Sequence, residues 1–213
     1  MPLLLRPDGG WEPRALAEAT HCIAQGGLVV FPTETVYGIG ADLRRPAAVA
    51  RLRLLKGLDP ARPLLLHCPD ASWLEQYAAA VPAYARRLAE AFWPGPLALV
   101  FAKSASVPRV VCGSGDTVGI RVVDHPVTRT LLSTLGSPLA GTSANLPGQT
   151  PPARLDDVPP ELRRGVDIAI DGGTCVFGAA STVVDASSEH PRLLRTGVVS
   201  RDAIEALLGF RLA

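Results

Sequence analysis

Residues 26–40 read GGLVVFPTETVYGIG, and this stretch carries the clearest signal of the fold class. It opens with two glycines, which are suited to end a preceding helix, and continues with the uninterrupted apolar run of residues 28–31. A short apolar run of this kind is typical of a strand that is buried on both faces. The stretch therefore predicts a buried strand that leads into a polar loop, which is where α/β sheets hold their ligands.

Further apolar runs and helical patterns alternate on both sides of this stretch. A helix is predicted over residues 14–25, with Pro13 suited to a first helical position. Further strands are expected at residues 64–67, 97–101, 118–122, 166–170, 182–184 and 193–194, and further helices at residues 47–55, 82–92, 126–135 and 200–208. This alternation predicts a layered α/β domain. Residues 182–195 look like two strands joined by a polar turn, so we expect a mixed sheet rather than a purely parallel one.

Length and charge limit the classes of protein to consider. The 213 residues fit a single domain over residues 1–213, with enough buried surface to fold without disulfides or a structural metal. The formal net charge is +1, from 21 Lys and Arg against 20 Asp and Glu. No global field therefore draws the chain onto nucleic acid, and any contact with RNA would need a local basic patch.

Cysteine usage and hydropathy predict the compartment. Four cysteines are spread along the chain without a C-x-x-C pair, at positions 22, 68, 112 and 175. This spacing argues against a zinc site or a disulfide framework and favours reduced thiols. The apolar stretch near the N-terminus is too short for a signal peptide, and no window is long and apolar enough to span a membrane. We therefore expect a cytoplasmic protein.

Four polar segments are candidates for chemistry. Residues 32–40 (PTETVYGIG) offer two hydroxyls, a carboxylate and a phenol to a small polar ligand, although an ordinary polar turn has the same composition. Residues 56–63 (KGLDPARP) place a lysine and an arginine after a helix, where they could bind phosphates or only complement the helix dipole. Residues 141–148 (GTSANLPG) and 178–182 (GAAST) are small and hydroxyl-rich, but neither matches a P-loop or a dinucleotide fingerprint.

The order of these segments resembles that of the YrdC/TsaC family of threonylcarbamoyl-AMP synthases over about residues 26–197. The likeness rests on six motifs that follow one another in the family's order: PTETVYG at 32–38, FWPGPL at 92–97, TVGIR at 117–121, SAN at 143–145, STVVD at 181–185 and LLRTG at 193–197. The resemblance implies a single-domain α/β fold, with a twisted, open mixed sheet, flanking helices and a concave cleft.

The resemblance also implies a reaction and a set of site residues. In the family, L-threonine, bicarbonate and ATP become threonylcarbamoyl-AMP and pyrophosphate, with Mg²⁺ accompanying the nucleotide. The product is passed to the machinery that makes threonylcarbamoyl-adenosine beside the anticodon of tRNA. The family's threonine contacts fall on Thr35, His67, Arg121 and Ser181, and its nucleotide contacts fall on Lys56, Arg62, Thr117, Ser143, Asn145 and Arg195.

The chain departs from the family pattern at Leu58. Family members usually carry K-x-R-P after the second helix, whereas this chain has Lys56-Gly57-Leu58-Asp59. We expect Arg62 to supply the missing charge. The alternatives are that an arginine of the preceding helix, such as Arg53, supplies it, or that the contact is missing and activity is weakened.

Two other functions stay open at the level of sequence. The first is a non-catalytic protein of the YciO-like branch that binds tRNA or double-stranded RNA, or assists ribosome assembly, for which a local arginine cluster between residues 44 and 62 would serve. The second is a carbamoyl-transfer domain like those of hydrogenase maturation proteins, which are normally found in longer chains.

Overall fold

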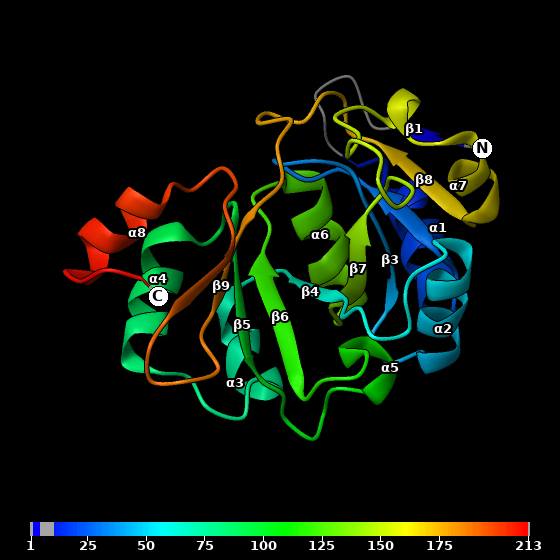
Figure 1. Cartoon of the computed structure of the whole chain (residues 1–213). Coiled ribbons are helices and arrows are strands. Elements are labelled where there is room, and N and C mark those ends of the chain that lie inside the picture. The colour runs from blue at the N-terminus through cyan, green and yellow to red at the C-terminus, as the bar shows by residue number, and fades with distance from the viewer. Residues whose placement is uncertain (1, 5–10, 213) are drawn as a thin grey trace.

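Strands from both halves of the chain join into one ten-stranded sheet in the computed structural model, which describes residues 2–4 and 11–212. The strands run in the spatial order β1-β8-β2-β3-β7-β4-β6-β5-β9-β10 (Figure 1). Their bounds are β1 (Pro2–Leu4), β2 (Val29–Phe31), β3 (Gly38–Asp42), β4 (Leu65–Cys68), β5 (Leu97–Ala102), β6 (Thr117–Val122), β7 (Leu139–Ser143), β8 (Ile168–Asp171), β9 (Thr182–Asp185) and β10 (Arg192–Arg195).

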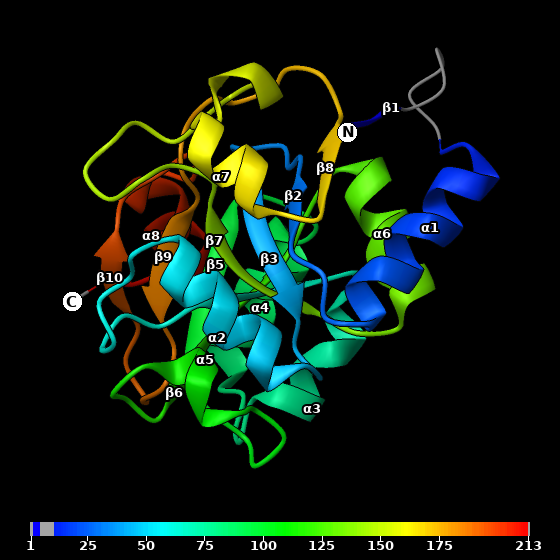
Figure 2. The ribbon, with the colours of Figure 1, turned by 90° about the vertical axis from the view of Figure 1, so that its right-hand side faces the viewer.

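Helices flank the sheet and pack on one another in pairs. They are α1 (Pro13–Ala24), α2 (Pro46–Leu55), α3 (Leu74–Tyr77), α4 (Ala83–Phe92), α5 (Arg109–Cys112), α6 (Pro126–Leu135), α7 (Pro160–Gly165) and α8 (Arg201–Leu208), with 3-10 turns η1 (Ala71–Trp73) and η2 (Leu155–Asp157). The α1 helix lies against α6, as Figure 2 shows, and α4 lies against α8. Local sequence explains several ends: the Ser200 hydroxyl accepts the backbone N–H of Ala203 at 3.1 Å to begin α8, and Gly136 ends α6 in the left-handed conformation.

The sheet is mixed, as the sequence predicts. Its parallel pairs are β1/β8, β2/β8, β4/β6 and β5/β9, and its antiparallel pairs are β2/β3, β3/β7, β4/β7, β5/β6 and β9/β10. The β9/β10 pair is the predicted hairpin within residues 182–195. The strands predicted near residues 28–31, 64–67 and 118–122 are confirmed as β2, β4 and β6.

Two strands at the centre of the sheet were predicted as loop. Residues 38–42 form β3 and residues 139–143 form β7, and these two strands pair along five residues. Both contain glycine where the packing leaves no room for a side chain. A Cβ atom at Gly38 would lie 2.6 Å from the Phe31 ring, and one at Gly141 would lie 2.6 Å from the carbonyl oxygen of Ile39. Tertiary pairing on both edges therefore overrides the weak strand propensity of these segments.

The buried apolar residues form two clusters. The larger one involves residues of α2, α4, α8 and the central strands, and the smaller one lies with α1 and α6, where Trp11, Ile23 and Leu131 pack on Phe31 of β2. All four cysteines are free thiols. Within residues 2–4 and 11–212, no helix has both the length and the apolar character to span a membrane.

Candidate active site

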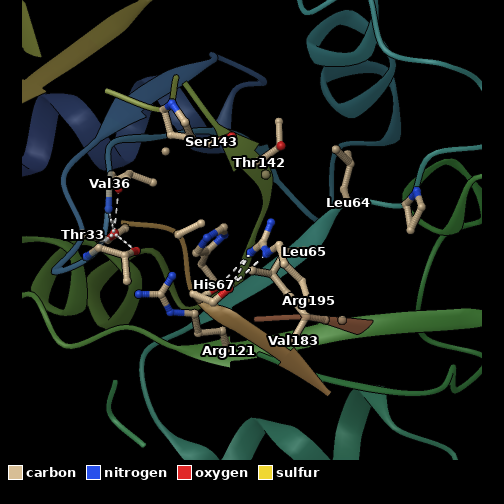
Figure 3. A pocket seen from close by; sticks show the side chains of 18 of the residues that line it. Thr33, Val36, Leu64, Leu65, His67, Arg121, Thr142, Ser143, Val183 and Arg195 are labelled. Carbon is tan, nitrogen blue, oxygen red and sulfur yellow. Dashed lines mark hydrogen bonds between the residues drawn. The ribbon is translucent and has the colours of Figure 1, made fainter. Parts of the chain in front are cut away.

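A cavity of about 280 Å³ opens on the concave side of the sheet. Its wall comes from the ends or middles of several strands and from the loops that join them, as the close view in Figure 3 shows. Between Gly38 of β3 and Gly141 of β7 the wall is bare backbone, because neither residue has a side chain. A concave pocket with a few polar groups is the usual form of a small-molecule site.

The loop between β2 and β3 supplies hydroxyl groups held in a fixed geometry. The Thr33 hydroxyl donates to the carbonyl of Val36 at 2.6 Å and accepts the backbone N–H groups of Thr35 and Val36 at 3.1 and 3.2 Å. It also lies 2.8 Å from the Thr35 hydroxyl, which faces the cavity. The following residue, Tyr37, donates its N–H to the carbonyl of Pro152 at 2.8 Å. Thr33 therefore orients Thr35, although the sequence singled out only Thr35.

A buried ion pair lies under one end of the cavity. Arg121 of β6 and Glu34 of the β2–β3 loop each have a side chain only 4% exposed, and Arg121 Nη2 lies 2.6 Å from Glu34 Oε1. These two atoms are in ionic contact but not aligned as a hydrogen bond. Arg121 Nε donates to the carbonyl of Gly95 at 3.0 Å, and Glu34 Oε2 accepts the N–H of Asp124 at 3.1 Å. Burial lowers the pKa of the Arg121 guanidinium, and the carboxylate of Glu34 opposes this shift.

His67 of β4 lies between Arg121 and Arg195 in Figure 3. Its ring meets the edge of Phe31, with the ring centroids 5.1 Å apart. Burial, and secondarily the charge of Arg121, lowers the pKa of His67 to about 3. Its buried Nδ1 atom has no hydrogen-bond partner among the residues that the structure describes. At neutral pH the imidazole is therefore uncharged.

Two more cations, Arg195 and Arg62, line the cavity. Arg195 of β10 donates from Nε and Nη2 to the carbonyl of Ser181, at 3.0 and 2.8 Å, and from Nη2 to the Ser181 hydroxyl at 3.1 Å. Arg62 lines the cavity from the loop after α2. Burial lowers the pKa of Arg195, and the charges of Arg121 and Arg62 lower it further. Three guanidinium groups close enough to repel one another make a site that favours anions.

Lys56 and Asn145 lie beside the cavity rather than on its wall. The Lys56 ammonium donates to the carbonyl of Ser143 at 2.6 Å and also to that of Asn145. The Asn145 side chain accepts from the Ser143 hydroxyl at 2.5 Å and donates to the carbonyls of Leu146 and Gln149. Burial, with a smaller effect of the Arg62 charge, lowers the pKa of Lys56 to about 8. In this structure Lys56 fastens the end of α2 to the end of β7, and Asn145 joins the end of β7 to the loop that follows it.

Eight of the ten site residues predicted from sequence line the cavity: Thr35, Arg62, His67, Thr117, Arg121, Ser143, Ser181 and Arg195. Lys56 and Asn145 do not. Arg53, the alternative to Arg62, is bound within the protein instead: its guanidinium donates to the carbonyls of Asp59, Pro60 and Arg62.

Glu34 is the functional candidate that sequence reasoning did not assign. The PTETVYG motif shows a carboxylate, but its partner comes from a strand far along the chain. A second missed contribution comes from the FWPGPL motif, in which Gly95 accepts from Arg121 through its carbonyl and donates its N–H to the carbonyl of Val122 at 2.9 Å.

Comparison with known proteins shows the same fold and similar sequences. The family model Sua5_yciO_yrdC, described as "Telomere recombination", matches residues 21–197. The chain is 40% identical over 191 residues to a threonylcarbamoyl-AMP synthase of Pyrococcus abyssi, covering 90% of this chain and 56% of the relative. The chain thus spans little more than half the length of that relative.

Solved structures agree. P. abyssi Sua5 complexed with L-threonine superposes with a TM-score of 0.92 at 37% identity, covering 100% of this chain and 62% of that one. E. coli YciO superposes with a TM-score of 0.86 at 27% identity, covering 96% and 98% of the two chains.

Proposed function

This chain belongs to the Sua5/YciO/YrdC family, and from that premise we propose that it joins L-threonine, bicarbonate and ATP into threonylcarbamoyl-AMP with release of pyrophosphate. The observation that carries the proposal is the cavity itself, where three arginines and several hydroxyls converge on one space. The product would serve the machinery that makes threonylcarbamoyl-adenosine next to the anticodon of tRNA.

The threonine carboxylate would bind at Arg121, because a guanidinium matches a carboxylate in charge and geometry. The uncharged His67 and the hydroxyls of Thr35 and Ser181 line the same cavity and suit the amine and side chain of the amino acid. The P. abyssi relative that superposes on this chain contains L-threonine, which supports this class of substrate.

The nucleotide would bind toward Arg62 and Arg195, with the hydroxyls of Thr117 and Ser143 beside it. In this reaction the carbamate oxygen of the substrate attacks the α-phosphate, and the bond to pyrophosphate breaks. No nucleophile from the protein is needed. The protein's contribution is to hold two anions together and to neutralise the charge that develops on the phosphate, which is the task of Arg62 and Arg195.

Residues 2–4 and 11–212 offer no cluster of metal-ligating side chains. Among the described residues, no group of three His, Cys, Asp or Glu side chains is placed to hold a metal ion. Glu34, the carboxylate under the cavity, is paired with Arg121. Mg²⁺ would therefore enter with the nucleotide, held by its phosphates, and we assign no protein side chain to it.

The test is an assay of pyrophosphate release and of an adenylated threonine product from ATP, threonine, bicarbonate and Mg²⁺. We expect release only when threonine and bicarbonate are both present, because the carbamate must form before it can attack. Release that continues without either one would indicate a plain ATPase and would refute the proposal. RNA binding without any pyrophosphate release would favour the non-catalytic alternative instead.

A further inference from the structure

The arginines around the cavity differ in whether a carboxylate neutralises their charge. Arg121 has a carboxylate partner, Glu34, and both side chains are almost fully buried. Arg62 and Arg195 have no carboxylate partner within the part of the chain that the structure describes, and Arg195 is held by neutral groups of Ser181. Arg121 is therefore already neutralised by a carboxylate, whereas Arg62 and Arg195, which line the same cavity, are not.

Hydrogen bonds with two backbone N–H groups hold Glu34 in this position. Its Oε2 accepts the N–H of Asp124, and its own carbonyl accepts the N–H of Phe177 at 2.9 Å. Arg121 is fixed in the same way by the carbonyl of Gly95. Glu34 does not line the cavity, so any effect on a ligand must act through Arg121 or through its electric field.

A paired guanidinium attracts ligands differently from an unpaired one. Near Arg121 a ligand meets an ion pair whose net charge is close to zero, and this arrangement suits a zwitterionic α-amino acid. A polyphosphate at the same place would meet the carboxylate a few ångströms behind the guanidinium, and the buried surroundings would screen that repulsion poorly. Repulsion of a wrong ligand is a common source of specificity.

We infer that Glu34 is a positioning and specificity residue that orients Arg121 for the amino acid and excludes phosphate groups from the space next to Arg121. This inference rests on the proposed function. It goes beyond that function by assigning the separation of the two substrates to a residue that touches neither of them.

The test is calorimetric titration of L-threonine into the protein, with and without inorganic pyrophosphate as the polyanion probe. For Glu34→Gln, which keeps the shape and removes the charge, we expect threonine affinity to fall about tenfold or more and pyrophosphate to compete with threonine. In the wild type we expect the two ligands to bind without competition. Asp124→Asn is the matched control, because it removes the same charge from an exposed side chain nearby and should behave as the wild type.

Glu34→Asp keeps the charge but has a side chain shorter by one methylene group. This variant provides the test if Glu34→Gln does not fold. We expect it to weaken threonine binding while pyrophosphate still does not compete. Wild-type threonine affinity in both folded variants, or in Glu34→Asp alone if only that one folds, would overturn the inference and leave the proposed function intact. Wild-type protein that binds no threonine would overturn both.

Discussion

Leu58 stands where family members usually carry an arginine, and Arg62 is the residue that we expect to supply the missing charge. Leu58 is partly buried and packs against the larger apolar cluster, so it is part of the core rather than of the cavity wall. Arg62 lies on the wall, and its charge contributes to the lowered pKa values of both Lys56 and Arg195. The loop that carries Arg62 packs closely on Gly113, where a Cβ atom would lie 2.2 Å from the carbonyl oxygen of Ala61.

We therefore expect Arg62→Ala to abolish measurable ATP binding, and Leu58→Arg to leave ATP affinity nearly unchanged. An arginine at 58 would have to leave an apolar contact to reach the cavity, whereas Arg62 already lines it. ATP titration of both variants, with the exposed Arg129→Ala as control, measures this. If Leu58→Arg instead tightens ATP by about 1 to 3 kcal/mol, the contact is missing in the wild type and Arg62 has not replaced it.

Arg121 and Arg195 should differ in the ligand that their loss affects. Arg121→Ala should chiefly weaken threonine binding and Arg195→Ala should chiefly weaken ATP binding, each by about 2 to 5 kcal/mol. Arg121→Ala should also lower thermal stability, because it leaves the buried carboxylate of Glu34 without a partner. Separate calorimetric titrations of the two ligands test the division, and it fails if both variants weaken both ligands to the same degree.

Among the elements, α2 has a role that its sequence pattern does not reveal. Arg53 in its last turn turns back onto the loop of residues 57–63 and donates to three of its carbonyl groups. A cation is favoured at a helix C-terminus in any case, but here it also fixes the loop that carries Arg62. The helix end and the loop that carries Arg62 are thus one structural unit.

Loosening this unit should affect one ligand only. We expect Arg53→Met to weaken ATP by about 1 to 3 kcal/mol, since the loop loses hydrogen bonds from a charged donor, and to leave threonine affinity unchanged. Arg51→Met is the control, because Arg51 lies on the same helix but pairs with Asp167. Equal losses of ATP affinity for both variants, or a loss of threonine affinity, would contradict this role of Arg53.

Elements with strong local signals could be predicted from sequence, and those defined by tertiary pairing could not. The α1 and α6 helices and the β2 and β6 strands have clear apolar periods or runs, and their positions agree with expectation to within a few residues. The β3 and β7 strands are rich in small residues, and only their neighbours in the sheet make them strands. The short α3 and α5 helices contain four residues each, too few for a periodic pattern.

The site shows the same division. Six of the eight predicted residues that line the cavity lie in motifs that follow the family order, and Arg62 and His67 lie outside those motifs. The pairing of Glu34 with Arg121, and the contact of Lys56 with the end of β7, depend on contacts between separate elements. Such contacts leave no local pattern in a single sequence.

At the scale of the whole molecule, the charge distribution matters more than its sum. The formal net charge is +1, yet Arg62, Arg121 and Arg195 share a single cavity with His67. His67 is buried at the middle of the sheet between β6 and β7, so its protonation state is linked to global folding. Its surroundings resist the positive charge that the unfolded chain accepts near pH 6.5.

This linkage predicts the pH dependence of stability. The pKa of His67 falls to about 3 on folding, so between pH 6.5 and 3 the unfolded state binds more protons than the folded state. Stability from this residue is complete above pH 6.5 and should decrease by up to about 1.4 kcal/mol per pH unit below it. The free energy of unfolding, measured with urea between pH 7 and 5, should change less with pH for His67→Gln than for the wild type or for the exposed control His190→Gln. Equal slopes in all three proteins would contradict this prediction.

The link between Lys56 and the end of β7 has a consequence for protein chemistry. The chain has only two lysines, Lys56 and Lys103. With a pKa of about 8, Lys56 carries a larger share of free amine at neutral pH than an ordinary lysine, yet it is almost fully buried against two carbonyl groups. Amine-reactive reagents will thus modify Lys103 first, and acylation of Lys56 will record how often α2 and β7 separate.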